Sequence, residues 1–86
     1  MTYQVQYSDA LNIKEIARFP AADLKRIKAA IERKLPSRPE IFGKPLRFSL
    51  KGHRSLHIGE YRVIFRIEKR IVRVLIIAHR STVYQD

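Results

Sequence analysis

One amphipathic stripe dominates the first half of the chain, with apolar residues three, four and four positions apart: Leu24, Ile27, Ile31 and Leu35. This spacing predicts a helix with one buried face. Pro20 suits the first turn of that helix. The segment 36–39, which begins and ends with proline, is expected to end it.

A shorter pattern precedes this helix. Residues 3–7 alternate between apolar residues and glutamine, which predicts a strand with one buried face. Ser8 or Asp9 can cap a first helix over 11–17. The join between the two helices is short, so they are expected to form an antiparallel helical hairpin.

The second half of the chain changes to a period of two residues. Apolar positions alternate over 46–50, 56–58 and 61–67, and a nearly continuous aliphatic run follows over 71–78. These patterns predict strands, the last of them central. The expected fold class is therefore α+β: an N-terminal strand and an antiparallel helical hairpin packed on one face of a three- to four-stranded antiparallel sheet. Residues 1–86 are expected to form a single domain.

A two-residue turn at Lys69-Arg70 would set the register of the last two strands. It predicts these opposite pairs: Arg66 with Arg73, Ile64 with Leu75, Arg62 with Ile77, and Glu60 with His79. The face turned away from the helices would then carry Arg62, Arg66, Arg73 and His79. Facing arginines destabilise a sheet, so a bound anion is one explanation. The other is a solvated face whose arginine stems cover apolar surface, and a longer turn would change the pairing.

The net charge of +10 points to a polyanion or an acidic protein as a partner. The excess is uneven: residues 1–43 contain eight basic and five acidic side chains, whereas residues 44–86 contain ten and three. Small soluble domains usually have a net charge of magnitude about 2–8, so solubility alone explains this excess poorly.

Several classes of protein are excluded by what the sequence lacks. The absence of cysteine removes disulfides, thiol catalysis and the usual zinc sites, and no metal or cofactor is expected. No apolar run approaches the roughly 20 residues that span a bilayer. The first residues show no secretory signal pattern. A cytoplasmic protein without a membrane contact is the simplest expectation.

The segment 55–67 reads Ser-Leu-His-Ile-Gly-Glu-Tyr-Arg-Val-Ile-Phe-Arg-Ile and resembles the central hairpin of RelE/ParE toxins from type II toxin–antitoxin systems. In that family a Gly-(Asp/Glu)-Tyr-Arg-Val motif is followed by a hydrophobic strand and a His-Arg-x-x-Val-Tyr ending. Here the ending runs from His79 to Tyr84. The helices and the Lys44-Pro45-Leu46 linker are also similar, so the resemblance covers the whole chain.

The resemblance favours the RelE branch, whose members cleave mRNA in the ribosomal A site without a metal and thereby inhibit translation. The 2′-hydroxyl of the RNA attacks the adjacent phosphate. By match to the family motif, Arg62 would hold the scissile phosphate, and its planar guanidinium suits this role. Arg80 would share that work. Tyr84 would stack on a base or assist proton transfer.

The resemblance leaves the general base open. RelE itself uses lysines on the strand before the Tyr-Arg motif, where this chain has Arg54 and His57 and no lysine. A histidine is chemically suited to neutral pH, so His57 and His79 are the candidates. Lys51 and Arg54 are expected to contact ribosomal RNA. Arg66 and Arg73 are also expected to contact the RNA or the ribosome.

Two other functions stay open on the same fold. ParE-type toxins inhibit DNA gyrase as binding proteins and perform no RNA chemistry. A non-catalytic RNA- or ribosome-binding module would use the same basic face without His57 or Tyr84. Each interpretation of the chain as a toxin implies an antitoxin that is encoded by an adjacent gene and covers the basic face.

Overall fold

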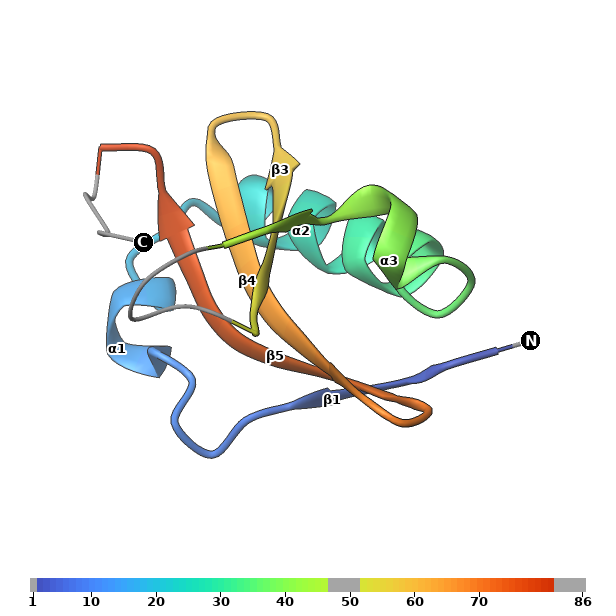
Figure 1. Cartoon of the computed structure of the whole chain (residues 1–86). Helices are drawn as coiled ribbons and strands as arrows, with labels where there is room; N and C mark the ends of the chain where they lie inside the picture. The colour runs from blue at the N-terminus through green and yellow to red at the C-terminus, as the bar shows by residue number, and fades with distance from the viewer. Residues whose placement is uncertain (1, 47–51, 82–86) are drawn as a thin grey trace.

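A five-stranded sheet forms the centre of the computed structural model, which describes residues 2–46 and 52–81 (Figure 1). The strands are β1 (Gln4–Tyr7), β2 (Lys44–Pro45), β3 (Arg54–Ile58), β4 (Tyr61–Glu68) and β5 (Ile71–His79). Their order in the sheet is β1-β5-β4-β3-β2. The predicted α+β class is confirmed. The sheet has more strands than predicted because β1 joins its edge, parallel to β5.

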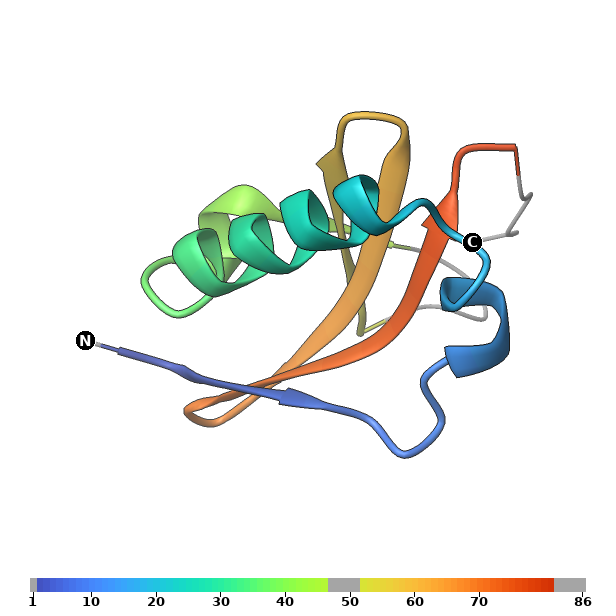
Figure 2. The ribbon, with the colours of Figure 1, turned by 180° about the vertical axis from the view of Figure 1, so that it is seen from behind.

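The predicted amphipathic helix is α2 (Ala21–Lys34), which crosses one face of the sheet (Figure 2). The two other helices are single turns, α1 (Ile13–Ile16) and α3 (Pro39–Phe42). The first helix of the expected hairpin is therefore much shorter than 11–17, and α3 was not predicted. Neither Ser8 nor Asp9 caps α1, because α1 begins only at Ile13 and its N-cap residue is Asn12. Among the described helices, none combines the length and hydropathy of a membrane-spanning segment.

The core lies between α2 and the sheet. Its fully buried members come from both layers: Ile27, Ile31, Leu35, Val63, Phe65, Val72 and Val74. Gly43, which precedes β2, packs directly against this core. A Cβ added there would lie 2.5 Å from Cζ of Phe65. Any larger residue at position 43 would therefore clash with the Phe65 ring.

The two-residue turn between β4 and β5 is confirmed, since Glu68 pairs with Ile71 and Arg66 with Arg73. The predicted register fails beyond this point. Phe65 pairs with Val74, but Ile64 pairs with Ile76, so Leu75 is an additional residue on β5 and forms a bulge. Every later position of β5 is shifted by one residue, and such a shift turns each side chain to the other face.

The bulge lies next to a contact that fixes α1 to β5. β1 ends at Tyr7 and leaves the edge of β5 without a neighbouring strand at Ile77. The side chain of Asn12 fills this place. Its Nδ2 donates to the Ile77 carbonyl at 2.8 Å, and its Oδ1 accepts from the Ile77 amide at 3.0 Å. One amide side chain thus satisfies both backbone groups.

An Asn12→Ala variant is expected to lower the free energy of unfolding by about 1–3 kcal/mol, because it leaves these two part-buried backbone groups without their partner. Urea unfolding followed by circular dichroism measures the change. Ser37→Ala, which removes an exposed hydroxyl that donates to the Lys34 carbonyl, is the control and should change stability much less. Equal unfolding midpoints for wild type and Asn12→Ala would contradict this role.

Candidate functional site

The face of the sheet opposite α2 carries two rows of neighbouring residues. One row crosses Lys44, Ser55 and Ile64, and the next crosses His57, Arg62 and Ala78. Neighbouring strands lie about 4.8 Å apart, so these side chains stand close together. They border a hollow of about 230 Å³, called here the basic hollow, with these lining residues: Lys44, Pro45, Leu46, Ser55, His57 and Arg62.

His57 and Arg62 are direct partners across β3 and β4. The Arg62 side chain is half-buried, and His57 is exposed. Within the described residues, neither side chain has a hydrogen bond or an ion pair. A guanidinium that is partly removed from water and has no carboxylate partner attracts an anion. The predicted phosphate-binding arginine and one of the two candidate general bases therefore meet at one site.

The other arginines on this face, Arg66 and Arg73, are paired internally. Glu68 bridges them, with Oε2 at 3.1 Å from Nε of Arg66 and Oε1 at 3.1 Å from Nε of Arg73. The repulsion expected from two facing arginines is thus relieved by a carboxylate of the protein itself, and no bound anion is needed to explain it.

Arg54 lies on the other face of β3, because it pairs with the core residue Phe65. Its Nη1 donates to the carbonyls of Glu40 and Gly43 at 3.2 and 3.0 Å. The Glu40 carbonyl lies within α3, and the Gly43 carbonyl lies just before β2. Arg54 therefore fastens that segment to β3, and its guanidinium is engaged inside the fold.

His79 also lies on the α2 side, contrary to the predicted face. The bulge at Leu75 brings it opposite Tyr61, and the rings form an edge-to-face contact at 5.2 Å between centroids. The Tyr61 hydroxyl donates to Asp23 of α2 at 2.6 Å. This hydrogen bond, together with burial, raises the pKa of the Tyr61 phenol. The predicted pairing of Glu60 with His79 is wrong, although their side chains remain 3.7 Å apart.

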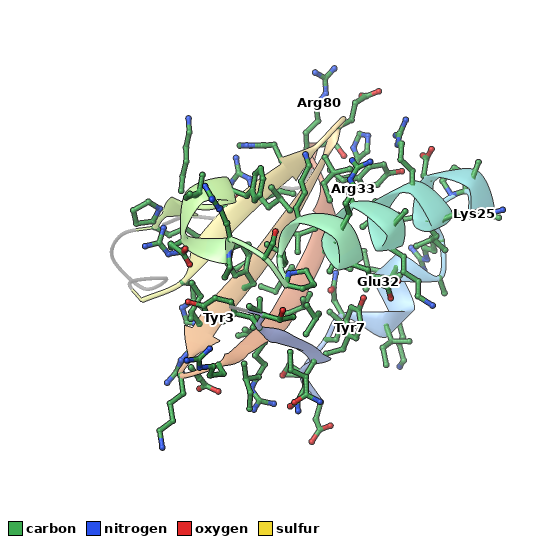
Figure 3. The ribbon with its side chains drawn as sticks, turned by 90° about the vertical axis from the view of Figure 1, so that its right-hand side faces the viewer. Tyr3, Tyr7, Lys25, Glu32, Arg33 and Arg80 are labelled. Carbon is green, nitrogen blue, oxygen red and sulfur yellow. The ribbon has the colours of Figure 1, made fainter. Side chains whose placement is uncertain are left out.

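Arg80 extends from the end of β5 away from the sheet (Figure 3). Its Nε lies 3.3 Å from Oε1 of Glu60, and its amide donates to the Glu60 carbonyl at 2.7 Å. Glu60 therefore neutralises Arg80 and contacts His79. The sequence predicts functional roles for five arginines: Arg54, Arg62, Arg66, Arg73 and Arg80. Of these, Arg62 alone has no hydrogen-bond or ion-pair partner within the described residues.

A second surface is apolar and lies between α1, α2 and the sheet. This apolar groove has a volume of about 210 Å³ and is lined mainly by aliphatic side chains: Tyr7, Leu11, Ile16, Leu24, Ile27, Lys28, Ile31 and Ile77. Tyr7 points toward Glu32 of α2 (Figure 3). Burial, and then the Glu32 carboxylate, raise the pKa of the Tyr7 phenol.

Residues 8–84 match the family model described as the ParE toxin of type II toxin–antitoxin systems. The chain belongs to this toxin family. The toxin is also similar to the toxin–antitoxin complex RelBE2 from Mycobacterium tuberculosis, with 28% identity, a TM-score of 0.83 and coverage of 93% of this chain and 100% of that chain. No curated protein matches the sequence of the toxin.

Two less similar structures share the fold of the toxin. The conserved hypothetical protein HP0894 from Helicobacter pylori has 16% identity and a TM-score of 0.71, covering 98% of this chain and 100% of that chain. YafQ from E. coli has 19% identity and a TM-score of 0.60, covering 92% and 94%. The recognition of a RelE/ParE-type toxin from the sequence is thus confirmed.

The toxin's candidate residues separate into distinct places. His57 and Arg62 meet at the basic hollow, whereas His79 and Arg80 gather around Glu60. Lys51 and Tyr84 lie outside the described residues. Lys44 and Ser55 were missed as site residues. No cluster of three potential metal ligands occurs within residues 2–46 and 52–81.

Proposed function

We propose that this toxin is an endoribonuclease that cuts mRNA on the ribosome by metal-independent attack of the RNA 2′-hydroxyl. One observation carries the proposal: Arg62 stands directly across from His57 at the basic hollow, and neither side chain has a partner within residues 2–46 and 52–81. Phosphoryl transfer needs a group that accepts the proton of the attacking hydroxyl and a cation that stabilises the negative charge on the phosphate. A histidine beside an arginine can supply both within one site.

The chemistry can be assigned to these two side chains. The 2′-oxygen forms a bond to phosphorus, the bond from phosphorus to the 5′-oxygen breaks, and a 2′,3′-cyclic phosphate remains. Neutral His57 accepts the 2′ proton. Arg62 binds two non-bridging phosphate oxygens and stabilises the additional negative charge of the transition state. The leaving 5′-oxygen takes up a proton, for which Tyr84 is the candidate from the family motif.

We also propose a cognate antitoxin that covers the basic hollow. Its binding segment would be acidic, since the toxin has a net charge of +10. The RelBE2 structure is a toxin–antitoxin complex, and so is that of DinJ with YafQ from E. coli, which has 20% identity to this chain. These complexes support a protein partner for this toxin. The apolar groove, on the α2 side of the sheet, offers a separate place for aliphatic side chains of that partner.

Inhibition of DNA gyrase is the second candidate, because the matching family model describes ParE toxins. A gyrase inhibitor would act as a binding protein. It would not require His57 to accept a proton.

Primer extension on a translated message distinguishes the two functions. The purified toxin is added to an mRNA with translating ribosomes, and to the same mRNA without ribosomes. We expect cuts inside codons in the first sample alone, and 2′,3′-cyclic phosphate ends on the upstream fragments. A parallel gyrase assay on relaxed plasmid should show normal supercoiling. Intact mRNA together with blocked supercoiling would refute the nuclease and establish the gyrase alternative.

A further inference from the structure

The floor of the basic hollow contains a buried hydroxyl without a partner. Ser55 is 4% exposed, and its Oγ has no hydrogen bond in the structure. No other buried side-chain nitrogen or oxygen of the described residues lacks a partner. Leaving a buried hydroxyl unsatisfied destabilises a folded protein, so its position beside His57 and Arg62 suggests that a ligand accepts its hydrogen bond.

The neighbour of Ser55 on β2 is a lysine. Lys44 pairs with Ser55 in the sheet and lines the same hollow. Its side chain is exposed and, within the described residues, has no hydrogen bond or ion pair. Lys44 and Arg62 therefore approach the hollow from the two strands that flank β3, and Ser55 lies between them.

The fold fixes where Lys44 stands. The preceding residue, Gly43, is buried with no room for a Cβ. The guanidinium of Arg54 holds the Gly43 carbonyl at 3.0 Å. The backbone that leads into Lys44 is thus clamped against β3 and the core. These contacts fix the backbone position of Lys44 at the edge of the site.

We propose that Ser55 and Lys44 complete a phosphate-binding site in the basic hollow, in which Ser55 Oγ donates a hydrogen bond to a phosphate oxygen and Lys44 supplies a second cation beside Arg62. Within the proposed nuclease function, this group is the scissile phosphate of the RNA. The volume of about 230 Å³ compares with about 30 Å³ for a water molecule in the liquid. It accommodates a phosphate group with some of its solvation water.

The test measures binding of inorganic phosphate to the free toxin by ¹H–¹⁵N NMR, at constant ionic strength set with chloride. In the wild type, the amide signals of Lys44, Ser55, His57 and Arg62 should shift together. Ser55→Ala should weaken binding about 3- to 10-fold, as for the loss of one hydrogen bond. Lys44→Gln should weaken it by a similar factor. When the titration is repeated at several fixed ionic strengths, the affinity of Lys44→Gln should depend less on salt than that of the wild type.

Matched controls separate binding from folding. Ser37→Ala and Lys25→Gln remove the same groups from exposed positions away from the hollow, and both should bind phosphate like the wild type. Ser55→Ala should be at least as stable as the wild type in urea without phosphate, because it removes an unsatisfied buried hydroxyl. A less stable Ser55→Ala variant with unchanged phosphate affinity would overturn the proposal, and so would wild-type affinity in Lys44→Gln.

Failure of the phosphate site and failure of the nuclease give different results. If phosphate binding depends on Ser55 and Lys44 while wild-type toxin leaves translated mRNA intact, the site stands and the nuclease function is refuted. If the toxin cuts mRNA at the same rate with Ser55→Ala and Lys44→Gln as without them, the nuclease stands and this assignment is overturned.

Discussion

An Arg62→Ala variant is expected to cut translated mRNA about 100-fold more slowly than wild type, or slower still. This is the typical loss when one preorganised donor to a developing oxyanion is removed. Arg62 is half-buried and has no ion pair in the part of the chain that the structure describes, so its charge is available to a phosphate without first breaking an ion pair there. Quantitative primer extension over a time course measures the rate.

The controls for Arg62 come from the same sheet and from the segment that follows α1. Arg66 is on the same strand but bound to Glu68, so Arg66→Ala should reduce the rate far less. Arg18→Ala changes the net charge equally at an exposed position and should have little effect. Arg62→Lys restores the charge without the planar fork and should recover activity in part. Equal losses in Arg62→Ala and Arg66→Ala would contradict a specific role for Arg62 and indicate general attraction of RNA to a basic surface.

The comparison between these arginines shows what the sequence could predict. The alternation of residues 61–67 and the two-residue turn correctly placed Arg66 opposite Arg73. The sequence did not reveal that Glu68, at the turn, would reach both guanidinium groups. Residue type indicates that a charge is present, whereas its partners depend on where the chain returns in three dimensions.

A single additional residue explains the largest error. Residues 71–78 are nearly all aliphatic, so their pattern lacks the polar alternation that would have marked Leu75 as a bulge. Without the bulge, His79 would share a face with Arg62. With it, His79 contacts Tyr61 on the α2 side, and the two candidate histidines are separated by the sheet.

Lys44 was missed for a different reason, and with it the neighbouring Ser55, which pairs with Lys44 across β2 and β3. β2 has only two residues, Lys44 and Pro45, and two residues have no periodicity to detect. Its placement depends on Gly43 packing against Phe65 and on Arg54, which reaches carbonyls 11 and 14 residues earlier in the chain. The sequence predicts ribosomal RNA contact for Arg54 from its charge alone. It does not reveal the structural role of Arg54, because long-range hydrogen bonds of this kind have no local sequence signal.

Replacing His57 by glutamine is expected to reduce the cleavage rate by about 100-fold or more, within the range of about 10²- to 10⁴-fold for a general base. Glutamine keeps a polar side chain at the position but cannot accept the 2′ proton. His57 is exposed, so the substitution should leave the unfolding midpoint nearly unchanged. Single-turnover cleavage on programmed ribosomes measures the chemical step separately from ribosome binding, which should persist.

The matched control is His79→Gln, which replaces the other candidate base on the opposite side of the sheet. Its ring contacts Tyr61, and its Nδ1 accepts a hydrogen bond from the Ser81 amide at 3.1 Å. Loss of these contacts should affect stability more than the cleavage rate. If His79→Gln abolished cleavage in a folded protein while His57→Gln cut normally, proton transfer would belong to His79. The scissile phosphate would then lie around the end of β5, where Arg80 and Glu60 lie, and Arg62, on the opposite face of the sheet, would not hold it.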